Sequence, residues 1–132
     1  MNVSNKQSGF TVIELLVAIT LCVATGVLFL QQKNQIEQVD RDRERKTAIN
    51  AMYYSLEEVY HPANNSYPRT LSADNLKSMD PALFVDPNGV KLGAQGSNYR
   101  YDPTNCDGNN CQSYTLRATL ESEADYVKKS IH

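Results

Sequence analysis

One carboxylate stands alone in a long apolar segment near the N-terminus. The segment runs from Phe10 to Leu30, and Glu14 is the only charged residue among its twenty-one positions. An isolated carboxylate in hydrocarbon costs roughly 2.5–3.5 kcal/mol on insertion scales. Glu14 therefore either lies near a membrane surface or pairs with a positive charge from another chain, because the segment holds no Lys or Arg. A new amino terminus at Phe10 would be one source of that charge.

The segment that holds Glu14 has the length and composition of a membrane span. A helix over residues 10–30 would be roughly 30 Å long, about the thickness of the hydrocarbon core of a bilayer. It is apolar all round, unlike the amphipathic helices of soluble proteins. The preceding residues contain one basic side chain, Lys6, which favours a cytoplasmic N-terminus. Thr25-Gly26 is a poor secretory cleavage site, so we expect the span to be retained.

The residues around Glu14 resemble a known export signal. The sequence GFTVIELLVAI, residues 9–19, is similar to the class III signal of type IV pilins and type II secretion pseudopilins. The similarity consists of a Gly before the cleavage point, a Phe after it, a Glu at the fifth mature position and the apolar helix. Members of this family often have Lys or Arg directly before the Gly. This chain has Ser8 there, a departure that bears on the efficiency of processing.

The resemblance implies a maturation step and a role for each residue. A prepilin peptidase in the membrane would cleave after Gly9, on the cytoplasmic side, and N-methylate Phe10. Glu14 would pair with the terminal amine of a neighbouring subunit during assembly. We expect Thr11 to add a hydrogen bond at the same site, so that Phe10, Thr11 and Glu14 together form the assembly site.

The chain after the apolar segment predicts a continuation of the same helix. Between Gln31 and Tyr60 there is no Pro or Gly, and apolar residues recur mostly at three- and four-residue spacing. We expect Pro62 to end the helix, because Pro cannot continue a helix and disfavours helical backbone at His61.

Charged residues dominate one stretch of this helix, residues 40–46. Such a stretch is either solvated or lies at a contact between subunits. Two pairs have the favourable i,i+4 order, worth a few tenths of a kcal/mol each; they are Glu37–Arg41 and Asp42–Lys46.

Residues 61–132 predict a small antiparallel sheet that needs the apolar face of the helix as one wall. Residues 113–120 alternate strictly between apolar and polar side chains, which is typical of a strand with one buried face. A second strand is expected at residues 97–101. The predicted fold class is α+β, a long N-terminal helix packed against this sheet, which is also the pilin architecture.

Three shorter features are predicted between the helix and the strands. Ser72 can cap a short helix that turns Leu76 and Met79 inward. Residues 86–89, with the sequence DPNG, predict a turn. Residues 60–68 resemble the segment of Tyr, short polar loop and Tyr-Pro that follows the helix in major pseudopilins.

The predicted strands are joined by a loop with two cysteines. Cys106 and Cys111 bracket four turn-forming residues, and an exported location favours oxidation, so we expect a disulfide between them. Cys22 lies in the apolar segment and is expected to be free.

The same loop contains oxygen-bearing side chains, and some secretion pseudopilins bind calcium in a C-terminal loop. Asp and Asn residues can ligate calcium, but they also simply form turns, and we favour the turn interpretation. No cofactor is therefore expected. The weak calcium candidates are Asp102, Asn105, Asp107 and Asn109.

The chain offers no arrangement of catalytic residues, and we expect it not to be an enzyme. Thirteen basic and fifteen acidic residues give a net charge of −2, so direct nucleic-acid binding is not indicated. The favoured function is that of a structural subunit of a type IV pilus-like filament. A major-type pseudopilin of a type II secretion system is an alternative within the family. A bitopic membrane protein with a small extracytoplasmic binding domain is the alternative from another class.

The resemblance also implies partners and location. The partners would be further copies of the chain, other pilins, the prepilin peptidase and an inner-membrane assembly platform with its ATPase. The chain would cross the cytoplasmic membrane once, with a cytoplasmic N-terminus, and then enter an extracytoplasmic filament. The predicted parts are a leader (1–9), a membrane and assembly half of the helix (10–30), an amphipathic half (31–60) and an extracytoplasmic sheet region (61–132), with residues 31–132 forming the globular domain.

Overall fold

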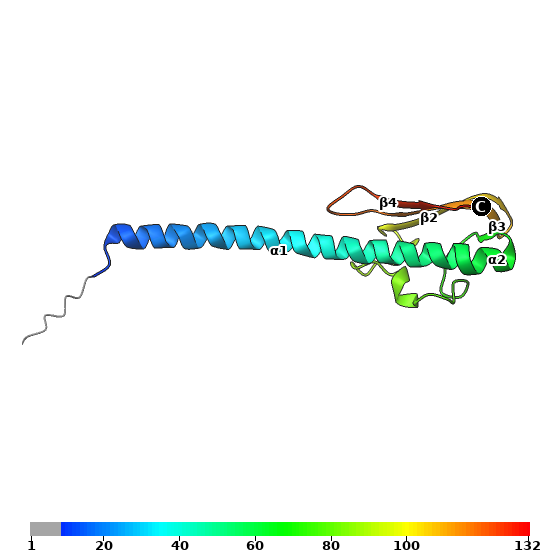
Figure 1. The fold of residues 1–132 in the computed structure, drawn as a ribbon, viewed down its shortest axis with the longest axis horizontal. Coiled ribbons are helices and arrows are strands. Elements are labelled where there is room, and N and C mark those ends of the chain that lie inside the picture. The colour runs from blue at the N-terminus through cyan, green and yellow to red at the C-terminus, as the bar shows by residue number, and fades with distance from the viewer. Residues whose placement is uncertain (1–8) are drawn as a thin grey trace, which may run out of the picture. The chain divides into compact units, whose positions relative to one another are not determined.

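The structure, a computed structural model, describes residues 9–132. The chain forms two compact units, one that ends at Ile36 and one that runs from Glu37 to His132. A single helix, α1 (Val12–Tyr54), contributes to both units (Figure 1). The predicted leader, residues 1–9, lies outside the described residues except for Gly9.

The helix continues beyond α1 and passes through a proline. A π-helical turn, η1 (Ser55–Tyr60), leads directly into α2 (His61–Asn64). The prediction that Pro62 ends the helix is therefore wrong. In the π turn the N–H of His61 bonds to the carbonyl of Leu56, so Pro62 falls in the first turn of α2, where its missing N–H removes no helical bond.

The helix ends instead at a left-handed residue. Asn65 has φ +51°, and its N–H donates to the carbonyl of His61 at 2.8 Å. Asn tolerates this conformation better than most residues with a side chain, which makes it a common helix terminator. The chain then turns back towards the sheet.

Four antiparallel strands form the sheet, with β3 (Asn110–Ala118) at its centre. β2 (Tyr99–Asp107) pairs with β3 along its full length. β1 (Tyr67–Pro68) and β4 (Tyr126–Lys129) pair with opposite ends of β3, both on its other edge. The α+β fold predicted from the sequence is confirmed.

The strands differ from those predicted in extent. β2 runs six residues beyond the predicted end at Tyr101, because Pro103 lies on an edge strand, where a missing N–H removes no ladder bond.

The predicted turn at residues 86–89 is confirmed. The N–H of Gly89 donates to the carbonyl of Asp86 at 2.8 Å, and Gly89 has φ +83°. Neither β1 nor β4 was predicted.

The short helix predicted after Ser72 is wrong. Residues 72–79 form turns, because the side chain of Asn75 accepts from the N–H of Ser72 and donates to the carbonyl of Thr70. Such side-chain bonds compete with helical ones. Leu76 is nonetheless buried, as expected. A 3-10 turn, η2 (Pro81–Phe84), follows instead.

One hydrophobic core joins α1 to the inner face of the sheet. The alternation predicted over residues 113–120 is confirmed, because the apolar members of the strand are buried. They pack with buried side chains from one face of the helix and from β1 and β2. The core contains Ala48, Ile49, Met52, Leu56, Tyr67, Leu76, Phe84, Tyr99, Cys111, Tyr114, Leu116, Ala118 and Leu120.

A two-residue loop, Gly108-Asn109, joins β2 to β3. Gly108 has φ +58°, a value that Gly adopts without strain in tight hairpins. The tight loop sets Cys106 directly opposite Cys111, and the structure has their sulfur atoms bonded. Cys22 is free.

We expect peptide mapping under non-reducing conditions to find Cys106 joined to Cys111 and Cys22 open to alkylation. Replacing both loop cysteines by Ala should lower the free energy of unfolding by about 2 kcal/mol, because the short loop then gains freedom in the unfolded chain. Denaturant unfolding of the detergent-solubilised chain measures this, with Cys22→Ala as the matched control. Two free thiols in the hairpin of cell-surface protein would contradict the prediction.

Candidate functional site

The predicted assembly residues lie together where α1 begins. Gly9 and Phe10 precede the helix and are exposed, as a peptidase substrate requires. Thr11 is the N-cap: its Oγ1 accepts the N–H of Glu14 at 3.3 Å. The sequence from Thr11 to Glu14 has the Ser/Thr-x-x-Glu pattern of a capping box. Thr11 thus has a role within the chain, in starting the helix.

Glu14 lies in the first turn of α1. A carboxylate there interacts favourably with the positive end of the helix dipole. The side chain of Glu14 is exposed, and the residue lies four positions after Phe10 in the sequence. Both ends of the proposed charge pair, the Glu14 carboxylate and the amine that cleavage would create at Phe10, are therefore presented by the same short segment.

The apolar half of α1 is uncovered in the single chain. Every residue from Gly9 to Leu30 is exposed, including large side chains such as Phe10, Leu16 and Phe29. Among the described residues, α1 with its continuation is the one helix long and apolar enough to cross a membrane. Apolar surface of this extent needs lipid or another protein to cover it.

The few polar groups in this half are satisfied within the helix. The hydroxyl of Thr20 donates to the carbonyl of Leu16 at 2.6 Å, and that of Thr25 donates to Leu21 at 2.9 Å. Because no hydroxyl is left without a partner, the segment suits a medium without water. Glu14 remains its one charged group.

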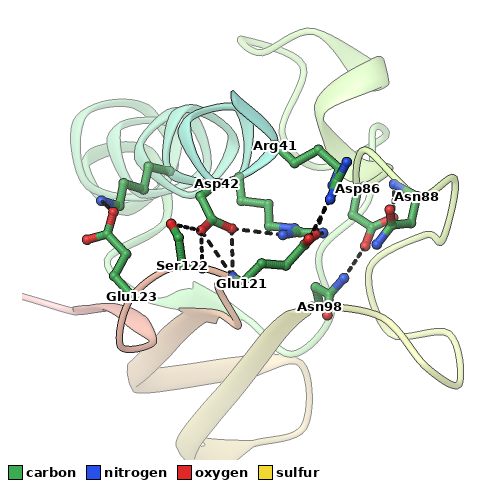
Figure 2. Close-up of polar contacts among 10 residues, drawn as sticks. Arg41, Asp42, Asp86, Asn88, Asn98, Glu121, Ser122 and Glu123 are labelled. Carbon is green, nitrogen blue, oxygen red and sulfur yellow. Dashed lines mark hydrogen bonds and ion pairs between the residues drawn. The ribbon is translucent and has the colours of Figure 1, made fainter. Parts of the chain in front are cut away.

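The charged stretch at residues 40–46 is more buried than predicted. It was predicted to be solvated or to lie between subunits, yet Asp42 and Arg45 are fully buried within the chain. Asp42 lies where the loop between β3 and β4 crosses α1, beside Glu121 and Ser122 (Figure 2). The Asp42 carboxylate accepts the backbone N–H groups of Glu121 and Ser122, both at 2.8 Å, and the Ser122 hydroxyl at 2.6 Å.

Arginines on the helix complete this contact. Arg45 donates to Asp42 at 2.9 Å and also pairs with Glu121 at 2.8 Å. Arg41 donates through its Nε to the same Glu121 carboxylate at 2.9 Å. We call these five residues the helix–loop clamp: Arg41, Asp42, Arg45, Glu121 and Ser122.

The predicted helical ion pair between Asp42 and Lys46 is wrong, because Asp42 is bonded within the clamp. Lys46 instead pairs with Glu123 at 2.6 Å, on the same loop. An exposed i,i+4 pair is worth only a few tenths of a kcal/mol. A carboxylate bonded to two backbone N–H groups and a hydroxyl gains more, so the loop outcompetes the helical partner.

The clamp shifts two carboxylates towards their charged forms. Burial by itself raises the pKa of Asp42, but the hydrogen bonds from Ser122, from the two backbone N–H groups and from Arg45 outweigh it and hold the pKa at about 2. Hydrogen bonds from Arg41 and then Arg45 lower the pKa of Glu121, also to about 2. Both groups thus remain ionised well below neutral pH.

The spacing of Asp42 and Arg45 was a signal that sequence analysis missed. Positions 42, 45, 49, 52 and 56 follow one another at three- and four-residue steps and lie on the buried face of the helix. Two charged residues therefore continue an apolar stripe. Charges at core positions indicate a buried partner rather than solvent.

A second buried polar cluster surrounds Glu57, and sequence analysis missed it too. Tyr67 donates to one oxygen of the Glu57 carboxylate at 2.8 Å, and Tyr114 donates to the other at 2.6 Å. Burial and the bond to Glu57 raise the pKa of both tyrosines. The cluster lies inside the core and links the π turn to β1 and β3, which indicates a structural role.

The calcium candidates are spread along the hairpin. Asp102, Asn105 and Asp107 lie in β2, and Asn109 lies in the loop that follows. Five residues of extended strand separate Asp102 from Asp107, roughly 16 Å, and Asp102 is bonded to Arg100. In the described part of the chain, no group of three or more His, Cys, Asp or Glu could hold a metal ion.

We expect Asp42→Asn to lower the free energy of unfolding by about 3 kcal/mol at pH 7, because it removes the charge that balances Arg45 and replaces one of the two acceptor oxygens with an NH2 donor. In the wild type, stability from Asp42 is full above its ordinary pKa of 3.8 and is lost as pH falls towards 2. That contribution amounts to about 2 kcal/mol. The free energy of unfolding of Asp42→Asn should therefore fall less steeply than that of the wild type as pH drops below about 4.

Urea unfolding of the detergent-solubilised chain between pH 7 and 2 measures both effects. Asp74→Asn, at an exposed aspartate, is the matched control and should leave stability unchanged. Equal stability of Asp42→Asn and the wild type at pH 7 would contradict the role of the clamp.

Comparison with known proteins identifies the N-terminal segment. Residues 4–28 match a family model described as the prokaryotic N-terminal methylation motif. The match covers the predicted cleavage point, the assembly residues and most of the apolar half of α1. No curated protein and no solved structure significantly matches the chain.

The match and the geometry agree on the character of the segment: a capped helix start with one carboxylate, followed by an uncovered apolar helix. The N-terminal segment of the chain therefore carries the class III prepilin signal that is found in type IV pilins and pseudopilins.

Proposed function

We propose that this chain is a structural subunit of a type IV pilus-like filament, which prepilin peptidase matures and which polymerises through its N-terminal helix. The observation that carries this proposal is the uncovered apolar half of α1, most of which lies within the methylation motif and which has Glu14 as its one charge. A filament of packed helices buries such a surface completely. A structural role of this kind needs no catalytic site.

Assembly would be guided by one charge pair. In a bilayer, Glu14 can remain near the headgroups, but in the core of a filament it lies far from water and needs a counter-charge. The amine at Phe10 of a neighbouring mature copy supplies it, and methylation preserves the positive charge. Any other stagger of the helices buries two unpaired charges, at several kcal/mol for each ion. The pair thus fixes the axial register.

The proposed partners and location follow from this mechanism. The precursor would cross the cytoplasmic membrane with its N-terminus in the cytoplasm, where the peptidase cleaves. An inner-membrane assembly platform and its ATPase would then lift the mature chain into the filament. The filament would serve in adhesion, twitching motility or DNA uptake.

A pseudopilin of a type II secretion system is the second candidate. It is favoured by residues 60–68, whose Tyr, polar loop and Tyr-Pro pattern resembles that of major pseudopilins. In the structure the tyrosine and proline at the end of this segment form β1, which pairs with the cysteine end of β3. A periplasmic location of the filament would favour this candidate over a surface pilus.

Mass spectrometry of the assembled protein should find residues 10–132 with one added methyl group on Phe10. The reason is the Gly9–Phe10 junction ahead of a span that is retained. A bulky residue at Gly9 should block cleavage for steric reasons, whereas Gly9→Ala is the mild control. Assembled protein that keeps residues 1–9 would contradict the proposal and favour a simple membrane anchor.

Glu14→Val should insert and be cleaved normally but reduce filament number by about tenfold or more, because the neighbouring amine loses its counter-ion on burial. Glu14→Gln keeps the shape without the charge and should be intermediate at best. Filaments are counted by electron microscopy after membrane levels are shown to be equal. Wild-type numbers from Glu14→Val would show that apolar packing alone sets the assembly.

A further inference from the structure

Two surfaces of the second unit each expose a pair of apolar side chains. On the helix, Tyr54 is 61 % exposed and Val59 is 52 % exposed. After β3, Val127 is 40 % exposed and Ile131 is 65 % exposed. Neither pair is covered by the single chain, and each lies beside charged residues of one predominant sign.

The first surface is a groove between the helix and the segment of residues 78–83, which includes part of η2. It holds a hollow of about 390 Å³ lined by the exposed helix residues and by Met79 and Leu83. The hydroxyls of Ser55 and Ser78 lie 2.8 Å apart and bind the segment to the helix, so the walls are fixed. We call it the helix groove: Tyr54, Glu58, Val59, Met79, Asp80 and Leu83.

The helix groove is acidic. Its lining contains the carboxylates of Glu58 and Asp80 and no Lys or Arg. Glu58 is exposed and makes no ion pair within the described part of the chain. The groove thus presents an apolar floor with negative charge at its rim.

The second surface is the outer face of the sheet. Along β4 and beyond it, exposed residues alternate with less exposed ones, so that Val127, Lys129 and Ile131 point away from the helix. Arg117 and Arg100, on β3 and β2, share this face. We call it the sheet face: Arg100, Arg117, Val127, Lys129 and Ile131.

The sheet face carries an excess of positive charge. Arg100 lies directly opposite Arg117 in the register, and like charges in that position repel. Each has one carboxylate, Asp102 at 3.2 Å and Asp125 at 3.9 Å. Lys129 has no carboxylate partner among the described residues. Three basic side chains therefore face two carboxylates on this surface, an excess of positive charge that favours an acidic partner.

The two surfaces match each other in spacing as well as in charge. Val127 and Lys129, two residues apart on a strand, lie roughly 7 Å apart along it. Tyr54 and Glu58, four residues apart on the helix, lie roughly 6 Å apart along it. An apolar group followed by a lysine can therefore meet an aromatic group followed by a carboxylate.

We propose that the sheet face of one copy docks into the helix groove of the next copy, with Lys129 against Glu58 and with Val127 and Ile131 against Tyr54 and Val59. Figure 1 shows the strands on one side of α1 and the green segment around residues 74–84 on the other. Because the two surfaces lie on opposite sides, each copy can use both, and the contact repeats without closing. This inference rests on the proposed filament function.

Charge reversal tests the contact in cells that assemble filaments from this chain. Lys129→Glu and Glu58→Lys alone should each lower filament number by about tenfold, since each places like charges together. The double variant restores opposite charges and should return near the wild-type level. Lys91→Glu, at an exposed lysine in neither surface, is the control and should assemble normally.

Cross-linking tests the same contact directly. In a Cys22→Ala background, copies with Val59→Cys and differently tagged copies with Ile131→Cys are expressed together, and filaments are oxidised. A mixed disulfide-linked dimer is expected. Its absence, or single charge variants that assemble like the wild type, would overturn the inference while wild-type filaments still support the proposed function. An absence of filaments from the wild-type chain would overturn both.

Discussion

The buried carboxylate of Asp42 is the constraint on which the second unit depends. Between Leu120 and Tyr126 the loop has one apolar side chain, Ala124, and that residue is exposed. Hydrophobic burial therefore cannot hold this loop on the helix. Three donors from Glu121 and Ser122 bind it to Asp42 instead, and the position of β4 on the free edge of β3 follows.

A buried ion pair is a costly way to fill a core, since each charge loses its water. An apolar pair of similar volume would cover the same surface but would offer no acceptor to the loop's backbone N–H groups. Asp42 replaces its lost water with directional bonds, and Arg45 and Arg41 then fix the Glu121 side chain. The clamp thus determines where the loop crosses the helix, which packing alone does not specify.

The two halves of α1 differ in what covers their side chains. In the first half, the hydroxyl groups bond within the helix and the apolar side chains remain uncovered, which suits lipid or a packed filament. In the second half, one face packs on the sheet, while the opposite face leaves a groove with acidic residues at its rim. Only the first half is matched by the methylation motif.

The sequence alone determined the features that depend on local pattern. The apolar segment around Glu14 predicts a membrane span. Alternation over residues 113–120 predicts a strand with one buried face, and DPNG predicts a turn. Each of these signals acts within a few residues of chain, so no distant partner is needed to interpret it.

The structure decided what depends on the geometry of individual hydrogen bonds, both between distant residues and between near neighbours. Asp42 appeared to be a solvated charge because its partners lie about 80 residues away. Pro62 was expected to stop the helix, but the π turn before it shifts the bonding pattern so that no bond is lost. Ser72 could cap a helix, but Asn75 binds the backbone first. In each case a hydrogen bond, rather than apolar pattern, selected the outcome, and hydrogen bonds depend on geometry that spacing does not encode.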